Sequence, residues 1–143
     1  AEAEEDPKCY QITNMSPAKF HISFSNQGKM APNKIMRLVC DNLIRRLSAF
    51  EKDFTEKITN PETDNSVEIV KRINYYDIKI SDTLNILNLL RVAVLLLDKN
   101  IKYLSVNESE LSWRIAHPDM KKIVTDAVKL LQNEFEKIKK YFN

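Results

Sequence analysis

The sequence predicts an all-α protein, an up-down-up-down four-helix bundle with an extended N-terminal arm tied to the first helix by one disulfide. Three observations carry the helical prediction. Residues 84–97 are almost continuously apolar, apolar residues recur at steps of three and four from residue 36 onward, and the 143-residue chain contains one glycine. Because turns between strands often use glycine, its scarcity favours helices joined by Pro, Asn and Asp.

Residues 84–97 are expected to form a central, buried helix. Their polar members, Asn85, Asn88 and Arg91, fall three apart and therefore follow one narrow stripe of the helix. The remaining circumference is aliphatic, so other elements must cover it.

Three further long helices are expected around this segment. Pro32 suits the first turn of a helix over 32–58, and Pro118 suits the start of another over 118–142. A third, over 66–80, would face inward with the residues Val67, Val70, Ile73, Tyr76 and Ile80. Ser81-Asp82 either separates this helix from the central one or bends a single helix over 66–104, and both alternatives remain open.

A short helix is predicted over 107–116, because Asn107 and Glu110 have the spacing of a capping box. It would connect the helix over 84–97 to the helix over 118–142. Residues 1–30 form an extended arm and strap in this prediction, with alternation at Phe20, Ile22 and Phe24, and residues 31–143 form the bundle. One domain is expected overall.

Two cysteines, Cys9 and Cys40, suggest one disulfide, which would fasten the arm to the first helix. Closing such a loop would contribute about 3–4 kcal/mol. The chain begins without methionine on an acidic run, as a chain does after removal of a signal peptide, so a secreted protein is expected. Two free buried thiols in a cytosolic protein are the alternative. Asn14 and Asn107 begin two sequons and are candidate glycosylation sites.

Charge and hydropathy indicate no nucleic-acid or membrane partner. The formal net charge is +2, and basic residues are interleaved with acidic ones, unlike a nucleic-acid footprint. Arg91 interrupts the longest apolar run before it reaches the length of a membrane span.

No residue pattern indicates catalysis. His21 and His117 have no ligand partner at metal-binding spacing, and the motifs that bind phosphates or dinucleotides need more glycine. We therefore expect no enzyme, no metal and no cofactor. Trp113 is interpreted as a core anchor rather than a partner-facing residue, and Tyr76 is expected to face inward while Tyr75 points outward or toward a second protein.

Two functions remain. The first is a secreted module that binds another protein through its surface. The alternative is a carrier that holds a lipid or another small hydrophobic ligand inside the bundle. In that case Asn85, Asn88 and Arg91 would face inward, where Arg91 could hold a ligand carboxylate; if the stripe faces water, it is a solvated helix edge.

Overall fold

The computed structural model describes residues 10–13, 21–24, 31–101 and 103–142. Within these ranges the chain forms three α-helices and a four-stranded antiparallel sheet, together with a separate two-stranded pair. The helices are α2 (Pro32–Thr59), α3 (Leu84–Leu97) and α4 (Met120–Tyr141). The strands of the larger sheet are β3 (Val67–Lys71), β4 (Tyr76–Ile80), β5 (Tyr103–Asn107) and β6 (Ser112–Ala116).

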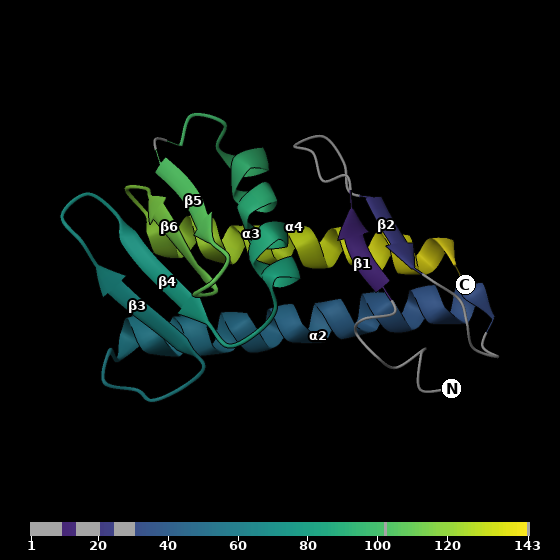
Figure 1. Ribbon diagram of the computed structural model, residues 1–143. Helices are drawn as coiled ribbons and strands as arrows, with labels where there is room; N and C mark the ends of the chain where they lie inside the picture. The colour runs from purple at the N-terminus through teal and green to yellow at the C-terminus, as the bar shows by residue number, and fades with distance from the viewer. Residues whose placement is uncertain (1–9, 14–20, 25–30, 102, 143) are drawn as a thin grey trace.

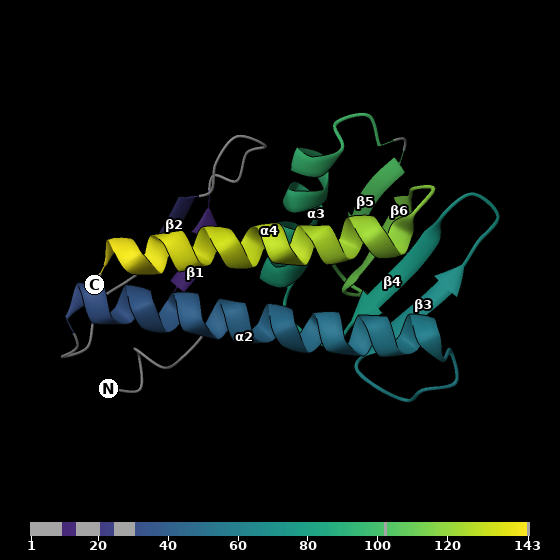
Figure 2. The ribbon, with the colours of Figure 1, turned by 180° about the vertical axis from the view of Figure 1, so that it is seen from behind.

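The helices α2 and α4 lie side by side and run antiparallel, and Figures 1 and 2 show the larger sheet packed at one end of this pair. Each helix buries one apolar stripe. In α2 the stripe includes Leu43, Leu47 and Phe54, and in α4 it includes Val124, Leu131 and Phe135, all of them fully buried. The helix pair is thus held together by its own inward faces.

The larger sheet has the strand order β3-β4-β6-β5, with all neighbours antiparallel. Its inner face contributes Val67, Ile78, Trp113 and Ile115 to the core, whereas Glu68, Lys79 and Arg114 are exposed on the outer face. This alternation has the period of two that a half-buried strand requires. The sheet therefore covers the core with one face and leaves the other open to solvent.

The helix α3 occupies the predicted residues 84–97 and, as the sequence predicted, it is buried on most of its surface. It packs mainly on α4, with further contacts to β5 and α2. The side chains of seven of its residues are buried: Ile86, Leu87, Leu89, Leu90, Val92, Ala93 and Val94.

The prediction of an all-α four-helix bundle is wrong, because the protein combines helices with an antiparallel sheet. The predicted helix over 66–80 is the β3–β4 hairpin. Its apolar residues fit steps of three and four, but Val67 and Ile69, and likewise Ile78 and Ile80, also alternate, and β-branched residues favour strands. Ile73, predicted to face inward, lies in the turn of the hairpin.

The predicted short helix over 107–116 is also wrong, since this segment belongs to the β5–β6 hairpin. Asn107 does accept hydrogen bonds from the following backbone, at Ser109 and Glu110, but it does so in the turn of the hairpin. The left-handed conformation that glycine usually supplies is adopted by Leu111, with φ of 51°. Leu111 packs partly buried against the core, so this side chain compensates for the backbone strain.

The predicted disulfide between Cys9 and Cys40 is also corrected. Cys40 is a free thiol and is fully buried in the stripe of α2. A bridge would require a second sulfur atom inside this packed stripe. Cys9 itself lies outside the described residues.

Two short strands lie in the N-terminal segment that was predicted to be extended. The strand β1 (Tyr10–Thr13) pairs antiparallel with β2 (His21–Phe24). The sequence analysis predicted an extended segment here but no pairing of two strands within it. Figures 1 and 2 show this pair beside the part of the two long helices that is remote from the larger sheet.

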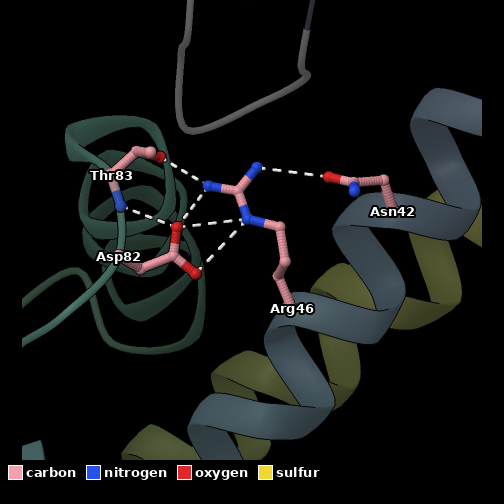
Figure 3. A network of polar contacts seen from close by, with 4 residues as sticks. All are labelled: Asn42, Arg46, Asp82 and Thr83. Carbon is pink, nitrogen blue, oxygen red and sulfur yellow. Dashed lines mark hydrogen bonds and ion pairs between the residues drawn. The ribbon is translucent and has the colours of Figure 1, made fainter. Parts of the chain in front are cut away.

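A polar cluster fastens α2 to the turn between β4 and α3 (Figure 3). The guanidinium of Arg46 forms an ion pair with Asp82 and donates a hydrogen bond of 2.6 Å to the hydroxyl of Thr83 and one of 3.3 Å to the side chain of Asn42. Asp82 also accepts the backbone N–H of Thr83 at 2.6 Å, where α3 begins. The chain therefore turns at residues 81–83, which decides against a continuous helix over 66–104.

We expect Asp82→Asn to lower the free energy of unfolding by about 1–3 kcal/mol, because the partly buried guanidinium of Arg46 loses its charged acceptor. Urea denaturation monitored by circular dichroism measures this change. Glu134→Gln is the matched control, since it removes the exposed pair between Glu134 and Lys137 and should change stability by less than about 0.5 kcal/mol. Equal effects of the two substitutions would contradict a structural role for the Arg46 cluster.

Candidate protein-binding surface

The turn of the β3–β4 hairpin projects from the molecule, and Figures 1 and 2 both place it at an extremity, beyond the sheet and the ends of the helices. We call residues 71–75 the β3–β4 tip. Ile73 in this tip is 98% exposed, the highest value among the exposed large hydrophobic residues of the described part of the chain. An isolated exposed isoleucine is unremarkable on a protein surface, so its surroundings decide whether it has a role.

Charged contacts join the turn around Ile73 to the strands β4 and β6. The carboxylate of Asp77 accepts a hydrogen bond from Nε of Arg72 at 3.2 Å and another from Nε of Arg114 at 3.1 Å. The guanidinium of Arg114 also lies over the ring of Tyr75, 5.2 Å from its centroid. These contacts connect Arg72 and Tyr75, on the two sides of the turn, to the side chains of Asp77 and Arg114.

The same contacts leave the β3–β4 tip with an excess of positive charge. Arg72 and Arg114 both contact the carboxylate of Asp77, and Lys71 lines the same hollow as Arg72. A broad, open hollow of about 820 Å³ lies against residues 71–75. The tip thus offers an aliphatic side chain, an aromatic ring and arginines in one place, which are residue types enriched at protein interfaces.

The structure places the aromatic residues as the sequence predicted, although on strands instead of helices. Tyr76 is partly buried and packs against the core, whereas the ring of Tyr75 lies in the tip beneath Arg114. Trp113 is fully buried in β6, which confirms its interpretation as a core residue. Its indole N–H has no hydrogen-bond partner among the described residues.

The stripe of Asn85, Asn88 and Arg91 lies on the partly exposed side of α3. None of these three residues is buried, whereas their neighbours on α3 are. This position resembles the solvated helix edge that the sequence also allowed. Binding of a ligand by these residues stays a prediction.

Both ring nitrogens of His117 are occupied. Nδ1 accepts the backbone N–H of Asp119 at 2.9 Å, and Nε2 lies 3.3 Å from the carboxylate of Asp98. The ring therefore has no free nitrogen for a metal or a substrate, and it connects the end of α3 to the start of α4. His21 lies in β2. Within the described ranges, no group of three or more His, Cys, Asp or Glu side chains is arranged to hold a metal ion.

The two candidate glycosylation sites differ in what the structure describes. Asn14 lies outside the described residues. Asn107 is exposed at the start of the β5–β6 turn, where its side-chain oxygen accepts a hydrogen bond of 2.9 Å from the hydroxyl of Ser109. A glycan attached there would project into solvent.

The searches of protein-family models and of curated proteins gave no match. Among the helices of the described residues, none is both long and apolar enough to cross a membrane. Any function must therefore be argued from the surface itself.

The sequence analysis missed most of the candidate surface. It singled out Tyr75, but it placed Ile73 on the inward face of a helix, interpreted Arg72 as part of a solvated helix face and gave Arg114 no role. The contact between Asp77 and Arg114 joins residues 37 positions apart and depends on the pairing of β4 with β6. The alternation of residues 76–80 was the available signal for a strand, and it would have placed Tyr76 and Asp77 on opposite faces.

We expect Cys40 to make stability fall at alkaline pH. Burial, followed by the negative charge of Asp41, raises the pKa of its thiol to about 11, whereas an unfolded thiol ionises near about 8.5. The folded state then holds the proton more tightly, so this stabilisation is complete below the unfolded pKa and is lost as the pH rises toward the folded pKa.

Between pH 8 and pH 10 the free energy of unfolding of the wild type should fall by about 1–2 kcal/mol more than that of Cys40→Ala. Urea titrations at the two pH values measure the difference. Parallel behaviour of the two proteins would show that the Cys40 thiol ionises as readily in the folded state as in the unfolded one.

We expect Asn107 to carry a glycan when the protein is secreted from a eukaryotic host. Intact mass spectrometry should show an added glycan mass that Asn107→Gln and Ser109→Ala both remove. Asn100→Gln changes an exposed asparagine outside any sequon and should leave that mass unchanged. An unmodified wild-type protein, or a glycan retained in full by Asn107→Gln, would be the contrary result.

Proposed function

We propose that the protein is a secreted, non-enzymatic module that binds another protein through the β3–β4 tip. The observation that carries this proposal is the full exposure of Ile73 within a set of fixed charged and aromatic contacts. Arg72 and Arg114 share the carboxylate of Asp77, and Tyr75 is covered by Arg114. A surface that is already ordered loses little conformational freedom when it binds.

The energetics of such a contact favour Ile73 as its anchor. Complete burial of an isoleucine side chain contributes about 1.5–3 kcal/mol. Tyrosine and arginine beside it are the residue types that most often carry binding energy at protein interfaces. One aliphatic anchor with a tyrosine and arginines around it would bury a small area of the partner's surface.

The chemistry of the tip also indicates the kind of partner. Ile73 requires an apolar pocket, and the basic side chains of Lys71, Arg72 and Arg114 favour carboxylates around its rim. We therefore propose a partner protein whose surface presents an apolar pocket with an acidic rim. The exposed sequon at Asn107 supports an extracellular location.

The carrier alternative has no observation in its favour beyond those of the sequence. Its proposed ligand contacts, Asn85, Asn88 and Arg91, share the partly exposed side of α3. The inner positions of α3 are occupied by aliphatic side chains that pack with α2, α4 and the sheet. Protein recognition through the β3–β4 tip is accordingly the function that we carry forward.

Photo-crosslinking tests this function. A photoreactive phenylalanine analogue at position 73 should give a discrete adduct in extracellular fluid from the natural source of the protein. The control carries the same analogue at position 141. Tyr141 is 86% exposed and lies at the end of α4 that is remote from the sheet, so this variant should not give the adduct. Excess wild-type protein should abolish the adduct, because both proteins compete for one pocket.

The competition also distinguishes a specific contact from adventitious labelling. Ile73→Asp should compete at least about tenfold less well than the wild type, since a loss of about 1.4 kcal/mol corresponds to a factor of ten. Ile73 is fully exposed, so its replacement should change the free energy of unfolding by less than about 0.5 kcal/mol. Equal competition by Ile73→Asp, or equal adducts from positions 73 and 141, would rule out the tip as the binding surface.

A further inference from the structure

The strand β3 is an edge of the larger sheet, because it pairs with β4 on one side and with no other described strand on the opposite side. A helix packs against each of the two edge strands, α2 against β3 and α3 against β5. Edge strands present unpaired backbone groups that can pair with another chain. The outward direction of the N–H and C=O groups of β3 therefore decides whether another strand can pair with it.

The hydrogen bonds at the two ends of the hairpin show which backbone groups of β3 face outward. Arg72 donates its N–H to the carbonyl of Tyr75 at 2.8 Å, and Ser66 accepts the N–H of Ser81 at 3.1 Å. Both pairs share the register of the β3–β4 ladder. Even-numbered residues of β3 therefore bond to β4, and odd-numbered residues direct their N–H and C=O groups away from it.

Three residues thus face the open edge: Val67, Ile69 and Lys71. The N–H of Val67 is already bonded to the side chain of Asn65, at 2.9 Å. The outward N–H and C=O groups of Ile69 and Lys71 form no hydrogen bond within the described residues. Two consecutive edge-facing residues are therefore available to a further strand.

We infer that two copies of this chain pair through β3, antiparallel and about a two-fold axis at Val70. In this register Ile69 lies opposite Lys71 of the second copy, so the two symmetric pairs form four backbone hydrogen bonds. Glu68 lies opposite Arg72 of the second copy, which pairs opposite charges twice. Val70, 43% exposed, meets its own copy at the centre.

Each of the neighbouring symmetric registers contains an unfavourable contact. A shift toward the start of β3 places Glu68 opposite Glu68 of the second copy, and a shift toward its end places Lys71 opposite Lys71. Like charges directly opposite each other are destabilising. The register centred on Ile69 needs the N–H of Val67, which Asn65 occupies. Charge and hydrogen bonding therefore favour the register centred on Val70. Lys71 disfavours the register that is shifted toward the end of β3.

The pairing shares Lys71 and Arg72 with the β3–β4 tip but does not include the turn residue Ile73, so Ile73→Asp tests the proposed function without changing the paired edge. The two sheets would join into one of eight strands with both outer faces on the same side. Because only two short strands contact each other, we expect a weak dimer, with a dissociation constant on the order of 0.1–1 mM.

Charge reversal tests the register. Sedimentation velocity of the wild type at rising concentration should show a reversible shift toward twice the chain mass. Glu68→Arg alone and Arg72→Glu alone should each lose that shift, because each places like charges opposite each other twice. An equimolar mixture of the two variants should recover it, since every charge pair in the mixed dimer is then opposite in sign.

The recovery keeps the test independent of folding defects, because a misfolded variant would not regain dimerisation on mixing. Circular dichroism and urea denaturation of each variant provide the direct check. Loss in one variant without recovery in the mixture would overturn the proposed register.

A cysteine at the symmetry axis gives a second measurement. With Cys9 replaced by Ser to remove a competing thiol, Val70→Cys should form a disulfide-linked dimer at least ten times faster than Lys79→Cys. Opposite residues at a non-hydrogen-bonded pair lie close enough for a disulfide, with Cα atoms about 4.5 Å apart. Lys79 is exposed on the same face but belongs to an inner strand, so it is the matched control.

Two results would refute the pairing. The first is a wild type that remains monomeric at about 1 mM, the concentration at which a contact of this size should be populated. The second is crosslinking of Val70→Cys no faster than that of Lys79→Cys.

Discussion

The burial of α3 is the constraint on which the rest of the structure depends. Its surface is apolar around most of the circumference, and seven of its side chains are buried. A helix of this kind is stable only when other elements surround it. The stripe of α4, the strand β5 and part of α2 meet this requirement, and the hairpins that precede and follow α3 join into one sheet over the same core. The Arg46 cluster then fixes where α3 begins.

This arrangement separates the parts that stabilise the protein from the parts that are free to contact other molecules. The inner face of the sheet and the stripes of the helices form the core, so the residues there are committed to packing. On the outer face of the sheet, Asp77 forms ion pairs with Arg72 and Arg114. The β3–β4 tip extends beyond the sheet. Binding at the tip would leave the core unchanged, because the tip residues contribute no fully buried side chain.

The sequence predicted the three long helices well and the two hairpins not at all. The residues of α3 and most of those of α2 and α4 have apolar repeats of sufficient length to exclude a strand. The hairpins consist of five-residue strands, in which Tyr76 and Ile80 are four residues apart and fit a helical repeat, while Tyr76, Ile78 and Ile80 also alternate. The scarcity of glycine was misleading because Leu111 adopts the left-handed conformation itself. The candidate surface depends on the contact of Asp77 with Arg114, which only the pairing of β4 with β6 creates.

The strand order also has a consequence for how the protein folds. The pairings of β3 with β4 and of β5 with β6 are local, whereas the pairing of β4 with β6 must close a loop that contains the whole of α3. Closure of this loop loses more chain entropy than either turn, so it is the slow and cooperative step expected of non-local pairings. Trp113, the single tryptophan of the chain, lies in β6 opposite Ile78 at this seam and is fully buried. The intrinsic fluorescence of the protein therefore follows the step that joins its two halves.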